Sequence, residues 1–150
     1  MNAALPNAGP GGSHKWGEVV RSGFQTVPDV LLIKQHDLEL DQTDMLVLLN
    51  LTSYWWYRDQ PPFPRTNVIA NRMGVTPRTV QRSLKKLEDK QYVRRDNYTD
   101  ENGFTFPAIY LDGLVAKLKS LADQDPTLSL KMIRGAIQQG EISEGEKIPF

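Results

Sequence analysis

The sequence predicts a mainly α domain with a small β-hairpin, an α+β fold. Two observations support this class. Between residues 66 and 90, a single Gly74 separates two stretches with helical periodicity, and Thr76-Pro77 then starts the second helix. Between residues 92 and 111, two runs of aromatic and β-branched residues flank a short loop with Asn-Gly, which is a strong hairpin signal. The expected framework is therefore a helix-turn-helix followed by a hairpin.

The length and composition allow one domain with a tail at each end. At 150 residues the chain can bury a hydrophobic core without crosslinks. It has no cysteine, which excludes disulfides and thiolate metal sites, and no apolar run reaches the roughly 18 residues that a membrane span needs. The N-terminus also lacks the basic start and apolar stretch of a secretory signal. We therefore expect a cytoplasmic protein with no membrane segment.

Four segments are expected along the chain: a disordered leader at 1–15, a folded domain at 16–111, two further helices at 112–139 and a polar tail at 140–150. The leader contains a Gly-Pro-Gly-Gly run and little that could pack. The folded domain begins with a weakly extended stretch to Val27. Pro28 then suits the first turn of a short helix that runs to about His36.

The first strong helix is predicted from Asp41 to about Tyr57. Asp41 suits the N-cap, and Asp44 stands three residues on, where a capping box places an acid. Apolar residues surround this helix, so we expect it to be buried on more than one side or to meet a partner subunit. Its last four residues, 54–57, are aromatic. They could stack on unpaired bases, but four consecutive helical residues point in four directions, which favours packing in the core or a dimer.

The stretch from Thr66 onward has the features of a helix-turn-helix. Thr66 can cap a short helix, and Ala70 is small, as is needed where two helices cross closely. Gly74 lies just past the helix end, where a left-handed residue is favoured. Thr76 can then cap the next helix, with Pro77 at its first position.

That next helix, predicted at 77–90, has one apolar stripe and one basic face. The stripe consists of Val80, Leu84 and Leu87, and the opposite face carries Arg78, Gln81, Arg82 and Lys85. Arg and Gln side chains read guanine and adenine edges in the major groove, so the expected base readers are Arg78, Gln81 and Arg82. The residues expected to contact DNA phosphates are Arg65, Thr66, Thr76, Thr79, Lys85, Lys86, Arg94 and Arg95.

The charge distribution supports this interpretation, although the total charge is zero. Residues 65–95 contain nine basic side chains against two acidic ones, so the rest of the chain is acidic by the same excess of seven. A segregated basic block is typical of a surface that binds a polyanion. A solvated helical face is the alternative explanation.

A hairpin of the kind called a wing is expected after the second helix. Its strands are predicted at 92–98 and 104–111, and Pro107 confines the second strand to an edge. Asp96, Asp100 and Glu101 are expected to make the tip acidic, so it should avoid phosphate, whereas Arg94 and Arg95 lie at the base. This pattern favours binding through helix 77–90 over insertion of the wing tip.

The phrase Val75-Thr76-Pro77-Arg78-Thr79-Val80-Gln81-Arg82 resembles the signature of winged helix-turn-helix proteins, both bacterial transcription regulators and phage or plasmid replication initiators. In that family a Leu-Glu-Lys-x-Gly-Tyr-Ile phrase follows, which here reads Leu87 to Val93 with Gln91 in place of the usual glycine. The resemblance covers roughly Val27 to Leu121. It implies that residues 16–111 form a winged helix-turn-helix DNA-binding domain with extra C-terminal helices.

Two C-terminal helices are expected. Asp112 can cap the first, whose apolar stripe is Leu114, Val115, Leu118 and Leu121, and the second is predicted at Thr127–Gln139. These stripes have little else to cover, so we expect residues 112–139 to form a homodimer contact.

The function expected from these features is sequence-specific binding of double-stranded DNA, with helix 77–90 in the major groove. A nucleoid-associated transcriptional regulator is favoured. One alternative is replication initiation or partition at origin repeats, with the replication machinery as partner in place of the transcription machinery. Another is a winged-helix protein-interaction module that does not bind DNA. No nucleophile–base pair, phosphate loop or metal-ligand spacing is present in the sequence, so we expect no enzyme activity, no cofactor and no metal.

Overall fold

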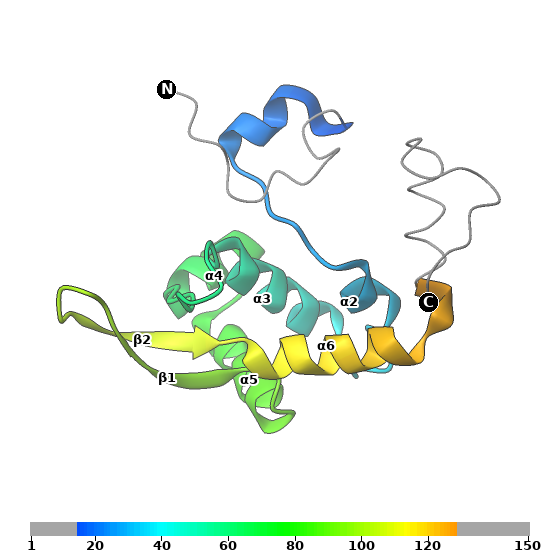
Figure 1. The fold of residues 1–150 in the computed structure, drawn as a ribbon. Coiled ribbons are helices and arrows are strands. Elements are labelled where there is room, and N and C mark those ends of the chain that lie inside the picture. Colours follow the sequence, from blue (N-terminus) through cyan, green and yellow to red (C-terminus); the bar gives the residue numbers. More distant parts are fainter. Residues whose placement is uncertain (1–14, 129–150) are drawn as a thin grey trace.

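A computed structural model describes residues 15–128 of the chain. In order, the elements are η1 (Gly17–Ser22), α2 (Asp29–Ile33), α3 (Gln42–Ser53), α4 (Thr66–Met73), α5 (Pro77–Asp89), β1 (Arg94–Thr99), β2 (Thr105–Tyr110) and α6 (Asp112–Gln124) (Figure 1). Within this range the chain is mainly helical with one antiparallel two-stranded sheet. The predicted α+β class is confirmed. The predicted leader apart from residue 15, the tail, and the predicted helix 127–139 apart from residues 127 and 128 lie outside the described residues.

Helix α3 lies at the centre of the helical body, with α2, α5 and α6 around it, and the hairpin extends away from the helices (Figure 1). Val47, Leu48 and Leu51 of α3 are fully buried, whereas Leu46 on its outer side is 49% exposed. The core joins them to apolar side chains of the other helices, including Leu31, Ile69, Val80, Leu87, Leu114 and Leu118. Helix α3 is therefore buried on several sides, as expected for a helix with apolar residues all around it.

The start signals of α3 and α5 act as the sequence predicts. The backbone N–H of Asp44 donates to Asp41 Oδ1 over 2.8 Å, and the N–H of Asp41 donates to Asp44 Oδ2 over 3.2 Å, which forms the capping box. At α5, the N–H of Thr79 donates to Thr76 Oγ1 over 3.3 Å. Gly74 between α4 and α5 has a φ of 67°, the left-handed conformation for which glycine is suited.

The predicted end of α3 is wrong by four residues. The helix ends at Ser53, and the N–H groups of Tyr54 and Trp55 reach back only three residues, to Leu51 and Thr52. The hydroxyls of Thr52 and Ser53 also donate to carbonyls three residues earlier, which is the competition with the backbone that weakens helices. As a result the aromatic run leaves the helix.

This early end changes the environment of the aromatic run. Trp55 packs against the core, as expected. Trp56 and Tyr57 are instead 51% and 54% exposed, so they do not pack in the core, and packing in a dimer stays a prediction for them.

Three further boundaries and the type of one element differ from the prediction. Thr66 is the first residue of α4 and the uncapped N-cap position is Arg65, while α6 begins at Asp112 after Leu111. In both helices the polar residue entered the first turn, where an acid such as Asp112 still interacts well with the helix dipole. Near the N-terminus, residues 17–22 form a 3-10 helix where an extended stretch was expected, and α2 ends at Ile33.

The predicted hairpin is present, with strands at Arg94–Thr99 and Thr105–Tyr110 where 92–98 and 104–111 were expected. Arg94 pairs with Tyr110, and the ladder continues to Thr99 opposite Thr105. Asp100 closes the loop, because its N–H donates to the Phe104 carbonyl and its Oδ1 accepts the N–H of Phe104, each over 2.8 Å. The other side of β2 accepts no further strand, but the N–H of Ile109 donates to the Pro62 carbonyl over 2.9 Å within the described range.

The turn between α5 and β1 is tight although it lacks glycine. Gln91 takes a left-handed φ of 63° there, at the position where the related phrase has glycine. Helix α6 packs directly on this turn, since a Cβ added to Gly113 would lie 1.9 Å from the Gln91 carbonyl oxygen. The N–H of Leu114 also donates to the Tyr92 carbonyl over 2.9 Å. Gly113 is therefore required for this close approach.

Candidate nucleic-acid interface

Helix α5 separates a buried face from an exposed basic face. Val80, Leu84 and Leu87 are at most 3% exposed, and Ser83 beside them is also buried. The opposite face carries Arg78, Gln81, Arg82 and Lys85, all of them exposed. The structure thus brings the three predicted base readers together on one side of the helix, over its first two turns.

These three side chains have no competing partner in the part of the chain that the structure describes. No ion pair or side-chain hydrogen bond between residues 15 and 128 engages Arg78, Gln81 or Arg82. The segment from Pro77 to Leu87 also contains no acidic residue. Their guanidinium and amide donors therefore remain available to a ligand.

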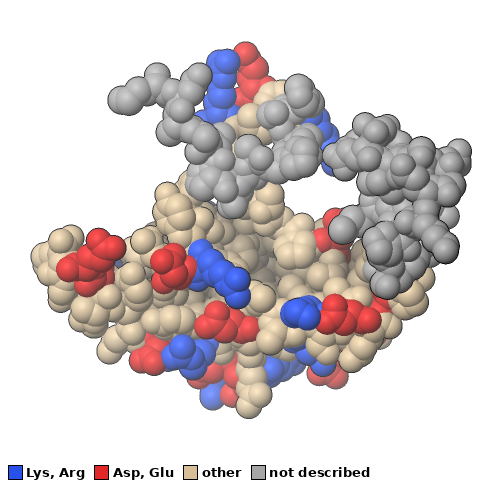
Figure 2. Space-filling model, viewed as in Figure 1, with Lys and Arg blue, Asp and Glu red and all other residues tan. Residues whose placement is uncertain are grey.

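Most other basic side chains of the block are already paired. Lys85 Nζ lies 2.8 Å from Asp89 Oδ1, Arg95 Nε lies 2.7 Å from Glu88 Oε2, and Arg94 Nη1 lies 2.7 Å from Asp96 Oδ2. The Arg94 guanidinium also stacks on the Tyr110 ring, 4.2 Å from its centroid. Figure 2 shows one face of the molecule, on which blue basic and red acidic side chains lie next to each other.

Of these pairings, only that of Arg94 with Asp96 lowers the positive excess of residues 65–95, because Glu88 and Asp89 are already counted in it. The hydrogen bond from Lys85 to Asp89 raises the pKa of this lysine above its usual value. Because exposed ion pairs contribute little net free energy, a phosphate can replace such an acid. Lys85, Arg94 and Arg95 therefore stay as predicted phosphate contacts.

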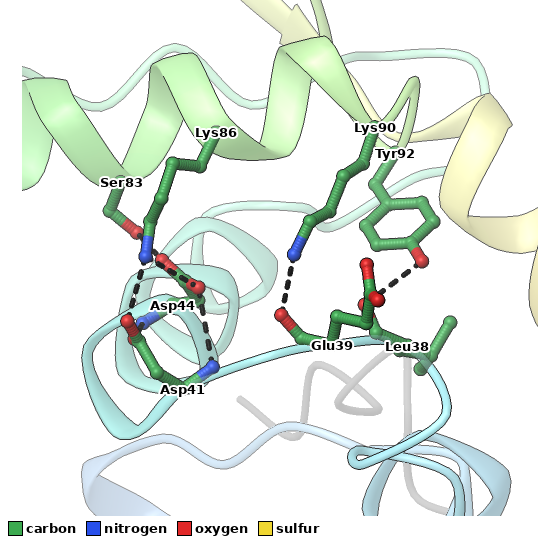
Figure 3. A network of polar contacts seen from close by, with 8 residues as sticks. All are labelled: Leu38, Glu39, Asp41, Asp44, Ser83, Lys86, Lys90 and Tyr92. Atoms are coloured by element: carbon green, nitrogen blue, oxygen red, sulfur yellow. Dashed lines mark hydrogen bonds and ion pairs between the residues drawn. The ribbon is translucent and has the colours of Figure 1, made fainter.

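Lys86 has a different environment, in a network that joins α5 to the start of α3 (Figure 3). Its Nζ lies 2.7 Å from Asp41 Oδ2 and 3.0 Å from Asp44 Oδ2, and Asp44 is only 1% exposed. Ser83 Oγ donates to the other oxygen of Asp44 over 2.6 Å. The hydrogen bond from Lys86 lowers the pKa of Asp41, and the same bond raises the pKa of Lys86. The structure thus places this amine against its own chain, so the predicted phosphate contact competes with a structural role.

The profile of the DnaD N-terminal domain matches residues 27–127. The chain belongs to the DnaD N-terminal domain family. The match covers almost the same residues as the helix-turn-helix resemblance in the sequence, and it connects the chain with DNA-associated function.

Two other comparisons concern individual proteins. Among solved structures, a possible transcriptional regulator from Methanosarcina mazei Go1 is 25% identical to this chain. The alignment covers 69% of this chain and 85% of that chain, with a TM-score of 0.37. No curated protein matches the sequence.

The remaining predicted contacts of this DnaD N-terminal domain lie at the starts of α4 and α5. Arg65 is exposed and has no side-chain partner among residues 15–128, and Thr66 beside it is half-buried. Thr76 Oγ1 serves the α5 cap and lies 3.1 Å from Thr79 Oγ1. Arg65 is therefore the most available of the predicted phosphate contacts.

Sequence reasoning missed the contacts that hold the far end of α5. Lys90 Nζ donates to the Glu39 carbonyl, and Tyr92 Oη donates to the Leu38 carbonyl over 3.0 Å (Figure 3). Burial raises the pKa of Tyr92. The partners are more than fifty residues apart in the sequence, so no local pattern could indicate them.

No three His, Cys, Asp or Glu side chains between residues 15 and 128 are grouped so that they could hold a metal ion. Across the same range, no helix combines the length and the apolarity needed to cross a membrane.

Proposed function

We propose that this chain binds double-stranded DNA sequence-specifically, with α5 in the major groove. The observation that supports it is the exposed face of α5, where Arg78, Gln81 and Arg82 lie together without protein partners in the described range. Arg reads the O6 and N7 of guanine in a bidentate manner, and Gln reads the N6 and N7 of adenine. A recognition helix contacts bases chiefly through its N-terminal residues, which is where these three side chains lie.

Replication initiation is the setting that we favour for this binding. Transcriptional regulation was the first expectation from the sequence, and replication initiation or partition was its alternative. Membership of the DnaD N-terminal domain family, which is related to replication initiation, favours the alternative. The proposed targets are then repeated sites at an origin, with the replication machinery as protein partner.

The proposal is tested by binding of a selected duplex and a random duplex over a range of salt concentrations, with Arg82→Ala as the variant. We expect this variant to bind the selected site more weakly by about 1–3 kcal/mol and to relax the base preference at one position. The matched control is Lys117→Ala on α6, which removes one exposed positive charge away from α5. It should leave affinity for both duplexes nearly unchanged.

The salt dependence separates this proposal from its rival. Each duplex phosphate contact adds about 0.9 to the slope of log affinity against log salt. A flat response, or equal loss for Arg82→Ala and Lys117→Ala, would contradict duplex reading by α5. A flat response would favour a protein-interaction module.

The proposal also includes two further points, that the chain forms a homodimer and that it is not an enzyme. Leu114 and Leu118 of α6 are buried within the chain, so they no longer argue for a dimer. Leu32 and Ile33 of α2 are 47% and 48% exposed and are the better candidates for a homodimer contact. A monomer mass that does not change with concentration in sedimentation would exclude the dimer. Metal-dependent nicking of DNA by the purified protein would overturn the non-enzymatic function.

A further inference from the structure

A second surface, which we call the aromatic groove, lies between the α3–α4 loop, α4 and β2. Its volume is about 680 Å³, and five rings line it: Tyr54, Trp56, Tyr57, Phe63 and Phe106. Three of these residues, Tyr54, Trp56 and Tyr57, belong to the aromatic run that the sequence placed inside a helix. Because α3 ends at Ser53, their rings can face the same groove.

The rings present flat apolar surface to solvent. Trp56, Tyr57 and Phe63 are each more than half exposed. Phe63 stacks on Phe106 of β2, with centroids 5.2 Å apart and ring planes only 13° from parallel. A contiguous exposed aromatic surface of this kind is typical of a binding site.

The charge around the groove is positive. Arg65 lines it, is exposed, and has no side-chain partner among residues 15–128. Arg72 lies over the Tyr54 ring, 4.8 Å from its centroid. None of the described residues that line the groove is acidic. A ligand with flat rings and negative charge therefore complements this surface.

The aromatic groove also continues toward α5. A neighbouring groove of about 660 Å³ shares Phe63, Pro64, Arg65 and Pro107 with it, and it reaches Leu84 of α5 and Arg95 of β1. Arg65 thus stands on the border between the two grooves. Asp96 also lines the neighbouring groove, and Leu84 is only 3% exposed, so the two grooves are continuous at Arg65 but do not extend along the base-reading face of α5.

We propose that the aromatic groove binds unpaired bases of single-stranded DNA, with the backbone phosphate at Arg65. Every base has a π-face, so stacking on Trp56, Tyr57 or Phe63 tolerates any sequence. An apolar peptide would also suit the rings, but it has no negative charge to pair with Arg65, whereas a phosphate forms the stronger charge-assisted hydrogen bonds. This site does not depend on duplex reading by α5, because none of the three base readers lines it.

The test measures the affinity of the full chain for a labelled 15-nucleotide oligothymidylate and for an abasic strand of the same length. We expect Trp56→Ala and Phe63→Ala each to weaken oligothymidylate binding about tenfold. The matched control is Trp16→Ala, which removes a 64% exposed tryptophan outside the groove and should change nothing. Thermal melting checks that each variant is folded. If Phe63→Ala is destabilised because it loses its contact with Phe106, the oligothymidylate affinity of Trp56→Ala alone tests the proposal.

The salt dependence of binding and the affinity for the abasic strand give two further, independent tests. Arg65→Gln should reduce the salt slope for the single strand by about 0.7, the contribution of one phosphate. Arg82→Ala should leave oligothymidylate affinity unchanged, so failure of this site and failure of duplex reading by α5 give different results. Equal affinity for the abasic strand, or unchanged binding by Trp56→Ala, would refute base stacking. The latter is the result expected if the groove binds a protein segment instead.

Discussion

Replacement of Lys86 by methionine tests whether the network between α5 and α3 stabilises the fold. The substitution keeps most of the apolar stem and removes the only ammonium group within ion-pair distance of Asp44 in the described part of the chain. Asp44 is 1% exposed, so its carboxylate would lose a charged partner in a place that water hardly reaches. Breaking a fully buried ion pair by removing one partner costs about 3–5 kcal/mol.

The geometry reduces that figure. The Lys86 side chain is 49% exposed, so solvent already screens its charge. Asp44 also keeps its hydrogen bonds from Ser83 Oγ and from the backbone N–H of Asp41. We therefore expect Lys86→Met to lower the free energy of unfolding by about 1–2 kcal/mol.

Urea unfolding at neutral pH, followed by circular dichroism, measures this loss. The matched control is Lys85→Met, whose amine pairs with Asp89 four residues on along the exposed side of α5. Exposed ion pairs of this kind contribute little to stability, so the control should unfold at the same urea concentration as the wild type. If Lys86→Met is as stable as wild type, or if the two variants lose equal stability, the network does not stabilise the fold as argued.

Three other predictions follow from the same structure. Lys86 lowers the pKa of Asp41 below its usual value of 3.8. The stability that this ion pair contributes is therefore complete above pH 3.8 and is lost as the pH falls through the lower pKa of the folded state. Across this acid range, the urea midpoint should fall less steeply with pH in Lys86→Met than in the wild type. Gly113→Ala should destabilise by roughly 1–3 kcal/mol, because its Cβ would collide with the Gln91 carbonyl, and an unchanged melting temperature would mean that α6 does not press on this turn. Gln91→Gly should stabilise the fold by about 0.5 kcal/mol, because glycine relieves the strain of the left-handed backbone but loses more conformational entropy on folding. A clear fall in the melting temperature would show instead that the Gln91 side chain contributes to stability.

The local features of the fold could be predicted from the sequence. The capping box at Asp41, the left-handed Gly74 and the cap at Thr76 each depend on residues within four positions of one another, so their chemistry is visible in the sequence. The exposed face of α5 follows from helical periodicity alone. These signals placed Arg78 and Arg82 correctly on one exposed side.

The remaining features depend on contacts between distant residues. In the sequence, Lys86 is one of nine basic residues in a block, and the carboxylates at the start of α3 come close to it only in the folded chain. The end of α3 was missed because apolar and aromatic residues continue past Ser53, and hydrophobic periodicity does not register the bonds of the Thr52 and Ser53 hydroxyls. The aromatic groove was missed for the same reason, since it joins Trp56 to Phe106 across fifty residues.

The contacts that α5 and the residues just after it make with residues 38–44, before and at the start of α3, have a mechanical consequence. Lys86 holds the last turn of the helix, and Lys90 and Tyr92 hold the chain just after it, all to residues 38–44 (Figure 3). A helix held in this way cannot roll about its own axis without breaking these bonds. The angle at which the domain would approach a duplex is therefore set before contact, and α5 gives up little freedom on binding. Any bending needed for a good fit would have to come from the DNA.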